Sequence, residues 1–285
     1  MIGSLQTGVS GLEQFQQDLE VIGNNIANVD TVGYKSSSME FEDALSQSLT
    51  SGSNAMQVGT GVSAAAINTL FTAGTLNSTG VATDLAISGT PASGFFVVKD
   101  PSSGATYVTR DGEFNIDANG YLINNSGLRV QGYTGTAPYT SASTVGDLQI
   151  NATAAIAALN DTTTPAPTLS SWSIDSSGQI TAQLSDNVSG VIGQVVLQNF
   201  TNPQALLKQG NNLYSYSTAA GALAAPVAPG TSGLGTIASG YLESSNVDLG
   251  TEMAALITAQ RAFEANGKII TASDEILQDI VNLKR

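Results

Sequence analysis

Two amphipathic segments at opposite ends of the chain constrain its fold more than any other feature. Near the N-terminus, apolar side chains recur at helical spacing between Leu5 and Ile26, which predicts a helix of about six turns within residues 1–30. Near the C-terminus, residues 247–285 repeat apolar side chains in a near-heptad rhythm, and no proline interrupts them. Because one helix cannot bury its own apolar stripe, the chain must double back and pair its ends in a coiled-coil-like stalk.

The C-terminal segment carries more apolar surface than one partner helix can cover. Its heptad positions are Leu249, Met253, Leu256, Phe263, Ile270, Leu277 and Val281, with Gln260, Gly267 and Asp274 at intermediate seam positions. A flanking stripe is formed by Ile257, Ile276, Ile280 and Leu283. Ser245, three residues before Asp248, is the expected start signal of this helix. The second stripe predicts contact with further helices, most economically those of identical subunits.

Between the two helical segments the sequence changes to the pattern of a β protein. Short β-rich runs such as SGFFVVKD, GYLINNSGLRVQGY and WSIDSSGQITAQL are bounded by DG, NG and SG turn signals. We therefore predict an α+β chain with a central antiparallel all-β domain at residues 76–236, interrupted by a loop or small excursion at 135–170. Residues 31–75 are expected to be extended, and residues 237–285 to form the C-terminal helical segment.

Composition excludes several classes of function. The chain has no cysteine and no histidine, so it lacks thiolate nucleophiles and the commonest general base and metal ligand. A net charge of −14 opposes binding to nucleic acid. No stretch is apolar for long enough to span a membrane, and the first residues lack the pattern of a Sec signal peptide, so if the protein is exported, the route is not the usual one.

Four aspartates could be read as an acid pair or a metal site. They are Asp84, Asp111, Asp117 and Asp175, but Asp111 directly precedes Gly112 and Asp117 lies three residues before Gly120, as hairpin turns require. The spacing of an EF-hand is absent. We therefore predict structural turns, and no catalytic, cofactor-binding or metal-binding residue.

The stretch GNNIANVDTVGYK follows the first helical pattern. Asn24, Asn25 and Asn28 are ordinary helix-end residues, but their uncharged side chains can also bridge to a neighbouring backbone. We predict that at least one of them forms a hydrogen bond outside its own helix. Gly33 is expected to let the chain turn away from the helix axis, with Tyr34 either starting an ordinary strand or anchoring the next segment on a neighbour.

Several long motifs occur in the order found in one known family. They are DLEVIGNNIAN at 18–28, TVGYK at 31–35 followed by Phe41, GFFVV at 94–98, TRDGEFNID at 109–117, VVLQNFTNPQALLKQGNNLY at 195–214, ESSNVDL at 243–249 and AQRAFEAN at 259–266. With these motifs the chain resembles the axial proteins of the bacterial flagellum, the rod and hook family. The resemblance covers nearly the whole chain apart from about residues 135–170.

The resemblance implies a structural subunit that assembles into a hollow helical tube. It implies terminal helices that line the tube, an extended segment at 31–75 between subunits, and a β domain outside them. Implied partners are further copies of the chain, other axial proteins of the rod, hook cap and hook–filament junction, and the flagellar type III export apparatus. The implied location is the hook or basal body of the flagellum.

Within the family, VIGNNIANVDTVGYK, NFTNPQALL and the ending VNLKR favour the hook, a flexible joint that transmits motor torque. The compact middle favours the distal rod, a stiff drive shaft, which remains the alternative. A secreted adhesin-like β protein is a remote alternative, and a carboxylate-based hydrolase is ranked last. The residues expected at subunit interfaces are Leu5, Leu12, Leu19, Ile22, Asn24, Asn25, Ile26, Asn28, Gly33, Tyr34, Phe41, Asn246, Leu249, Met253, Leu256, Gln260, Arg261, Phe263, Ile270 and Leu277.

Overall fold

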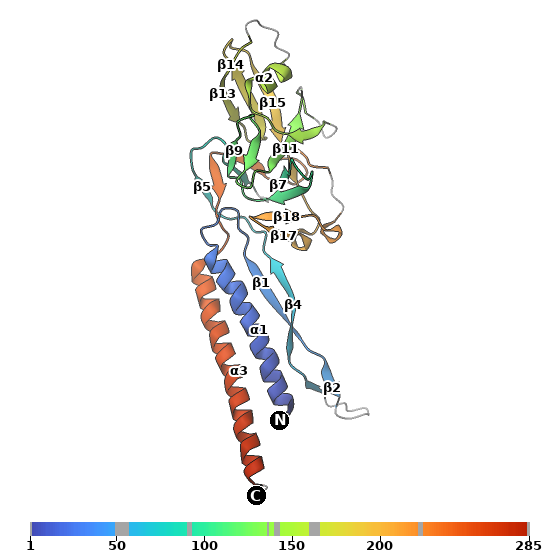
Figure 1. Ribbon diagram of the computed structural model, residues 1–285, viewed down its shortest axis with the longest axis vertical. Helices are drawn as coiled ribbons and strands as arrows, with labels where there is room; N and C mark the ends of the chain where they lie inside the picture. Colours follow the sequence, from blue (N-terminus) through green and yellow to red (C-terminus); the bar gives the residue numbers. More distant parts are fainter. Residues whose placement is uncertain are drawn as a thin grey trace. The chain divides into compact units, whose positions relative to one another are not determined.

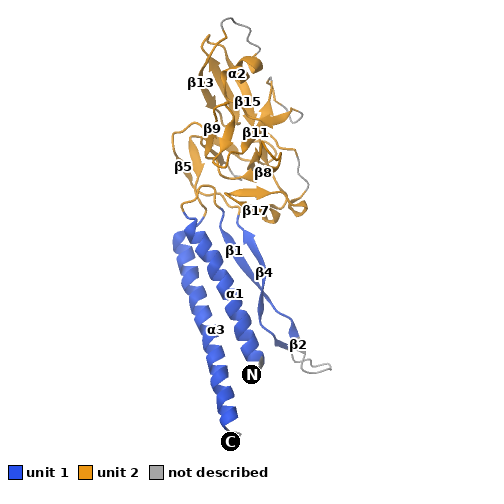
Figure 2. Cartoon of the chain, in the orientation of Figure 1, with its two compact units in different colours: residues 1–29, 35–70, 247–285 blue, residues 30–34, 71–246 orange. Residues whose placement is uncertain are grey.

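The computed structural model of the chain is shown in Figure 1, and it describes residues 2–48, 57–89, 93–135, 137–139, 143–159, 166–221 and 225–283. Parts of the predicted segments 31–75 and 135–170 therefore lie outside the described residues. The chain forms two compact units, which Figure 2 distinguishes by colour. We call residues 1–29, 35–70 and 247–285 the helical unit, and residues 30–34 and 71–246 the β unit.

The helical unit contains the two terminal helices and four short or medium strands. Its elements are α1 (Ile2–Ala27), β1 (Ser37–Asp43), β2 (Ser46–Ser48), β3 (Gln57–Gly59), β4 (Val62–Thr69) and α3 (Leu249–Leu283). Helices α1 and α3 lie side by side (Figure 1), as the two amphipathic patterns predicted. They run antiparallel, since Ser4 lies beside Ser273 at one end and Asn25 beside Glu252 at the other. Supercoiling of this pair remains a prediction.

Helix α3 begins three residues later than the start signal predicted. The side chain of Asp248, not that of Ser245, caps the helix: its Oδ1 accepts from the backbone N–H groups of Gly250 and Thr251 at 2.8 and 3.2 Å. Both residue types are good caps, so the spacing alone did not separate them. The predicted segment 237–285 accordingly starts with strand residues and becomes helical only at Leu249.

Strands β1 and β4 form a two-stranded antiparallel ribbon within the segment that was predicted to be extended. Their register pairs Ser37 with Thr69 and Asp43 with Val62, and it shifts by one residue between Glu40 and Phe41. The ribbon packs against α1, and the rings of Phe15 and Phe41 meet at a centroid distance of 5.4 Å. The short strands β2 and β3 pair with each other at the far end of the ribbon.

The β unit is built almost entirely from short antiparallel strands. Its elements are β5 (Leu76–Ser78), β6 (Leu85–Ser88), β7 (Phe95–Lys99), β8 (Thr106–Thr109), β9 (Phe114–Ile116), β10 (Leu122–Asn124), β11 (Arg129–Thr134), β12 (Val145–Asp147), α2 (Ala152–Leu159), β13 (Leu169–Ile174), β14 (Gln179–Leu184), β15 (Ser189–Val195), β16 (Leu197–Gln198), the 3-10 turns η1 (Pro203–Ala205) and η2 (Thr218–Ala220), β17 (Leu207–Gly210), β18 (Leu213–Ser215), β19 (Thr236–Ser239) and β20 (Tyr241–Glu243).

Within the described residues, twelve of these strands form one sheet. Its main path runs β13-β14-β15-β11-β7-β8-β18-β17, with β9, β10, β12 and β16 attached to its middle. Strands β6 and β19 form one separate pair, and β5 and β20 another. The central antiparallel β domain predicted from the turn signals is therefore present.

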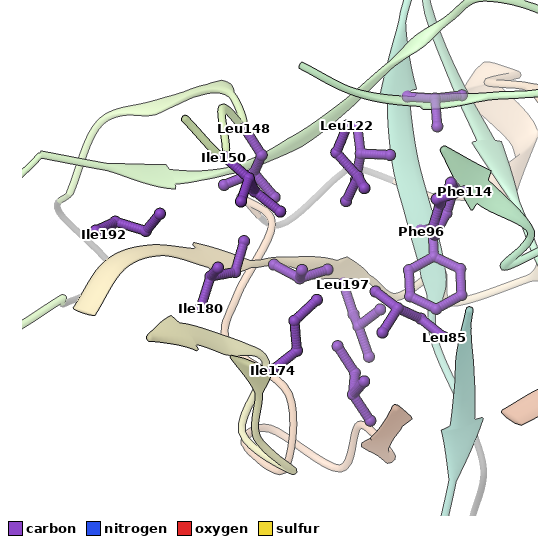
Figure 3. Close-up of a cluster of buried hydrophobic side chains, with 14 of the residues drawn as sticks. Leu85, Phe96, Phe114, Leu122, Leu148, Ile150, Ile174, Ile180, Ile192 and Leu197 are labelled. Atoms are coloured by element: carbon purple, nitrogen blue, oxygen red, sulfur yellow. The ribbon is translucent and has the colours of Figure 1, made fainter. Parts of the chain in front are cut away.

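Strand β7 explains why the run SGFFVVKD is continuously apolar. Phe96 and Val98 belong to the main core cluster, whereas the alternate residues Phe95 and Val97 belong to a second cluster on the other face. A strand buried on both faces carries apolar side chains at successive positions. Figure 3 shows the main cluster, in which Phe96 and Phe114 meet edge to face at a centroid distance of 5.3 Å.

The predicted loop or excursion at 135–170 contains more regular structure than its composition suggested. It includes β12 and the helix α2, whose start is capped by Oδ1 of Asn151 accepting from the N–H of Ala154 at 2.7 Å. Helix α2 packs on β14 and β15, and its residues Ala155 and Ala158 join the main core. Helix α2 is rich in alanine, which favours helix formation and is small enough to fit close to the sheet, and the buried residues Leu148 and Ile150 just before it also join the main core.

The aspartate turns are found at two of the predicted positions. Oδ1 of Asp117 accepts from the N–H groups of Asn119 and Tyr121 in the hairpin between β9 and β10, and Asp175 does the same between β13 and β14. Asp111 does not close a hairpin, because β8 and β9 are not paired with each other. Asp84 accepts from the hydroxyl of Thr79.

None of the helices that the structure describes combines the length and the apolarity that a membrane span requires.

The core predicts different effects for two substitutions in strands β7 and β9 of the same sheet. Phe96→Ala should lower the free energy of unfolding by about 3–5 kcal/mol, because it removes a fully buried ring and leaves a cavity. Ile116→Ala, at a side chain that is 37% exposed, should cost less than about 1 kcal/mol. Urea unfolding followed by the fluorescence of Trp172, the single tryptophan, measures both. Equal losses for the two variants would contradict this assignment of the core.

Candidate assembly interface

The seam between α1 and α3 is made largely of small and polar residues. Gly8 lies against Ile270: a Cβ added at Gly8 would come within 3.2 Å of Cγ1 of that isoleucine. A Cβ at Gly11 would come within 2.8 Å of Nδ2 of Asn266. Glycine at both positions therefore allows the two helices to approach closely. The N-terminal pattern was predicted from its apolar residues, so these glycines were missed, although their spacing of three residues is the available signal.

The seam on α3 differs from the predicted one by a single residue at each intermediate position. Ala259 and Ser273 are buried, and Asn266 contacts α1. The predicted seam residues Gln260, Gly267 and Asp274 lie one position further along: Gln260 and Asp274 are exposed, and no atom lies within 4 Å of a Cβ at Gly267. A heptad seam alternates steps of three and four residues, and small or polar residues at both candidate positions left the order of these steps undetermined.

Asn25 connects three elements of the helical unit. Its Nδ2 donates to the carbonyl oxygen of Ser37 at 2.8 Å, and its Oδ1 accepts from the N–H of Ser37 at 3.0 Å. The same Nδ2 lies 3.2 Å from Oε1 of Glu252 in the first turn of α3. The side chain, which is 2% exposed, thus pairs with the start of β1 as a neighbouring strand would.

The prediction that one asparagine bonds outside its helix is confirmed for Asn25, and its partners belong to the same chain. Asn28 behaves as an ordinary helix-end residue, because its Nδ2 donates back to the carbonyl oxygen and Oδ1 of Asn24 at 2.9 and 3.0 Å. Asn246, further along the chain in the β unit, donates from Nδ2 to Oγ1 of Thr72 at 2.8 Å.

Gly33 and Tyr34 belong to the β unit. Gly33 has φ of +67°, in the left-handed region that favours glycine, and a Cβ there would come within 2.9 Å of the backbone of Arg110 and Asp111. The ring of Tyr34 is buried in its own chain, and Nζ of Lys208 lies 5.7 Å from the ring centroid. A side chain buried in this way does not fit the predicted anchor on a neighbouring subunit.

Several predicted interface residues of α3 are exposed in the single chain. Leu249 and Met253 are each 45% exposed, and they lie on the flank of the seam together with Ile257. At the other end, Leu277 follows the last seam contact at Ser273, so it and the rest of α3 extend past the start of α1 (Figure 1). Among the described residues, these apolar side chains of the helical unit therefore remain partly exposed.

The remaining predicted interface residues vary in burial. Ile22 is buried, and Phe41 is 40% exposed despite its contact with Phe15. Half-buried side chains are found at Leu5, Leu12, Leu19, Ile26, Leu256 and Ile270, and exposed ones at Asn24, Gln260, Arg261 and Phe263. Their roles between subunits stay predictions.

Acidic side chains are the candidate metal ligands in a chain that has no histidine and no cysteine. Among the described residues, no three acidic side chains come close enough to hold a metal ion. Burial raises the pKa of Asp111 to about 6 and also raises the pKa of Asp18 on α1. Asp111 accepts from the N–H of Glu113 and so acts as a turn residue.

Three family profiles match the chain. "Flagella basal body rod protein" matches residues 5–35, "Flagellar hook protein FlgE/F/G D1 domain" residues 86–182, and "Flagellar basal body rod FlgEFG protein C-terminal" residues 238–283. The two terminal profiles thus cover α1 with the turn at Gly33, and α3 with the strands before it.

Curated relatives match over the full length of the chain. The flagellar basal-body rod protein FlgG of Bacillus subtilis is 39% identical over 294 residues, covering 100% of both chains. FlgG of Caulobacter vibrioides is 36% identical over 294 residues, covering 99% of each. The flagellar hook protein FlgE of Borreliella burgdorferi is 26% identical, and its alignment extends over 447 residues, which shows that it carries segments missing from these 285 residues.

These similarities revise the preference for the hook. The profile that matches the C-terminal motifs is shared by FlgE, FlgF and FlgG, so those motifs do not separate hook from rod. The chain is more similar to the rod relatives than to the hook relative, both in the length of the alignment and in the percentage of identical residues.

Asn25 provides a test of the network that holds the helical unit together. Asn25→Ala should lower the stability of this unit by about 1–3 kcal/mol, because it leaves the buried backbone groups of Ser37 without their partner. Thermal unfolding followed by helical circular dichroism measures the loss. Asn24→Ala, at an exposed neighbouring position, is the control, and a loss as large as that of Asn25→Ala would contradict the assignment.

Proposed function

This chain belongs to the family of flagellar rod and hook proteins, and on that premise we propose that it is a subunit of the distal rod. It is a structural component of the flagellar axis, and its family is not one of enzymes. The observation that carries the rod assignment is the full-length match to basal-body rod proteins, with an alignment scarcely longer than the chain itself. The hook relative needs large additional segments.

The geometry supports assembly through the terminal helices. Helix α3 leaves an apolar flank at Leu249, Met253 and Ile257 uncovered, and its end continues past α1. A soluble monomer gains nothing from such exposed surface, whereas a helical polymer of identical subunits can cover it repeatedly. In this proposal the helices line the tube, and the partners are further copies of the chain, neighbouring axial proteins and the flagellar export apparatus.

The location of the subunit in isolated hook–basal bodies tests the rod assignment. Gold-labelled antibodies against the purified chain should bind only to the straight segment between the rings and the hook, after the outer ring is stripped. Antibodies against the filament serve as the control for accessibility. Label along the curved hook would overturn the assignment to the rod.

Met253 tests the exposed flank of α3 as a contact between subunits. Met253→Lys should weaken self-association by at least about tenfold, because a lysine charge must then be desolvated at each repeat of the contact. Polymerisation of the purified chain and swimming of a complemented strain measure the effect. The matched variant Met253→Leu keeps the apolar surface and should assemble normally. Equal assembly of both variants would exclude this flank from the interface.

A further inference from the structure

Glu243, at the end of β20, binds three separate parts of the β unit. Its Oε1 accepts from the backbone N–H of Gly74 at 2.9 Å, and its Oε2 lies 3.3 Å from Nη1 of Arg110. Its own carbonyl oxygen accepts from the N–H of Gly33 at 2.7 Å. The side chain is 1% exposed, so the carboxylate exchanges water for these protein donors.

The partner cation is buried as deeply as the carboxylate. The side chain of Arg110 is 2% exposed, and its guanidinium lies 5.0 Å from the centroid of the Phe95 ring. Two buried opposite charges in contact are strongly coupled, since the removal of one leaves the other without compensation. The pair therefore holds strand β20 against the segment that follows β8.

Two glycines are needed for the chain to approach this ion pair. A Cβ at Gly74 would overlap the carbonyl oxygen of Ser244, the residue after Glu243. A Cβ at Gly33 would come within 2.7 Å of the backbone nitrogen of Asp111, the residue after Arg110. Each glycine thus packs on the backbone beside one member of the pair.

The three segments around Glu243 all adjoin residues of the helical unit in the sequence. Residues 30–34, residues 71–74 and residues 243–246 are the parts of the β unit that continue directly into the helical unit. Further hydrogen bonds involve these segments: Asn212 donates from Nδ2 to the carbonyl oxygen of Val32 at 2.7 Å, Asn246 donates to Thr72, and the N–H of Ser244 donates to the carbonyl oxygen of Thr75 at 2.8 Å. We call these three segments the connectors.

We infer that Glu243 is the positioning residue that holds all three connectors in place within the β unit. Its carboxylate binds the second connector directly at Gly74, its backbone binds the first at Gly33, and it belongs to the third. The ion pair with Arg110 fixes it to the sheet. This inference goes beyond the proposed function, since it applies to the single chain whether it is placed in the rod or in the hook.

Hydrogen exchange of the full-length protein tests the inference. The double variant Glu243→Leu with Arg110→Met replaces the ion pair by apolar side chains of similar size, an exchange that buried pairs often tolerate without unfolding. We expect the amides of Gly74 and Gly33 to exchange at least about tenfold faster in this variant, whereas core amides such as that of Val130 keep their wild-type rates. The amide of Gly33 is the decisive probe, because it binds the backbone of Glu243 and not the carboxylate.

A second ion pair among the described residues of the β unit provides a control. Nη1 of Arg129 lies 2.8 Å from Oδ2 of Asp147, and the two side chains are 27% and 29% exposed. The double variant Arg129→Met with Asp147→Leu should leave both glycine amides at their wild-type rates.

Three results would overturn the inference. Unchanged protection of Gly74 and Gly33 would show that the connectors do not depend on the ion pair. Faster exchange at Gly74 alone would show that Glu243 only accepts a hydrogen bond from Gly74 and does not hold the other connectors. A uniform increase that includes the core amides, or an equal increase in the Arg129 and Asp147 control, would indicate general loss of stability. The single variant Glu243→Gln, which keeps an acceptor for Gly74, should show a smaller increase at both amides than the double variant.

Discussion

The close packing of the first helix on the last is the constraint on which the rest of the structure depends. Helix α1 ends near the start of α3 because the two run antiparallel, so everything between them must leave and return at one end of the pair. Gly8 and Gly11 allow the helix axes to approach. Several large apolar side chains of α3, such as Leu249, Met253 and Ile257, lie on its flank and are about half exposed. In the proposed assembly, these exposed side chains would contact neighbouring subunits.

The composition of the chain fits the same requirement. Only 11% of its residues are charged, although the acidic excess gives a net charge of −14. Charged side chains on closely packed identical subunits would face one another repeatedly, and each such contact would require desolvation. Neutral polar residues such as Asn25 can instead be buried when both sides of the amide find partners in the backbone.

The sequence predicted the elements of this fold more successfully than their contacts. Both terminal helices and the antiparallel domain follow from periodicity and turn residues, which are local properties. The seam positions on α3 were displaced by one residue because Ala259 and Ser273 are small and do not stand out from the residues that follow them. The contact of Asn266 with α1 depends on Gly11 on the other helix, which no pattern within α3 shows. Helix α2 was missed because its alanines resemble a loop in composition and become core residues only against the sheet. The burial of Tyr34 depends on residues far away in the sequence, so it could not be predicted from the residues around it.

The same distinction explains the glycines around Glu243. In the sequence, Gly33, Gly74 and the ESSN motif are separated by many residues, and each alone suggests only a turn or a strand end. In the fold they lie around one buried carboxylate, and the two glycines are required by the backbone beside Glu243 and Arg110. The residue type at Gly33 and at Gly74 is therefore constrained by the ion pair between Glu243 and Arg110. A substitution at either glycine should therefore disturb the connectors in the same way as the loss of the carboxylate, because the added side chain would collide with the backbone beside the ion pair.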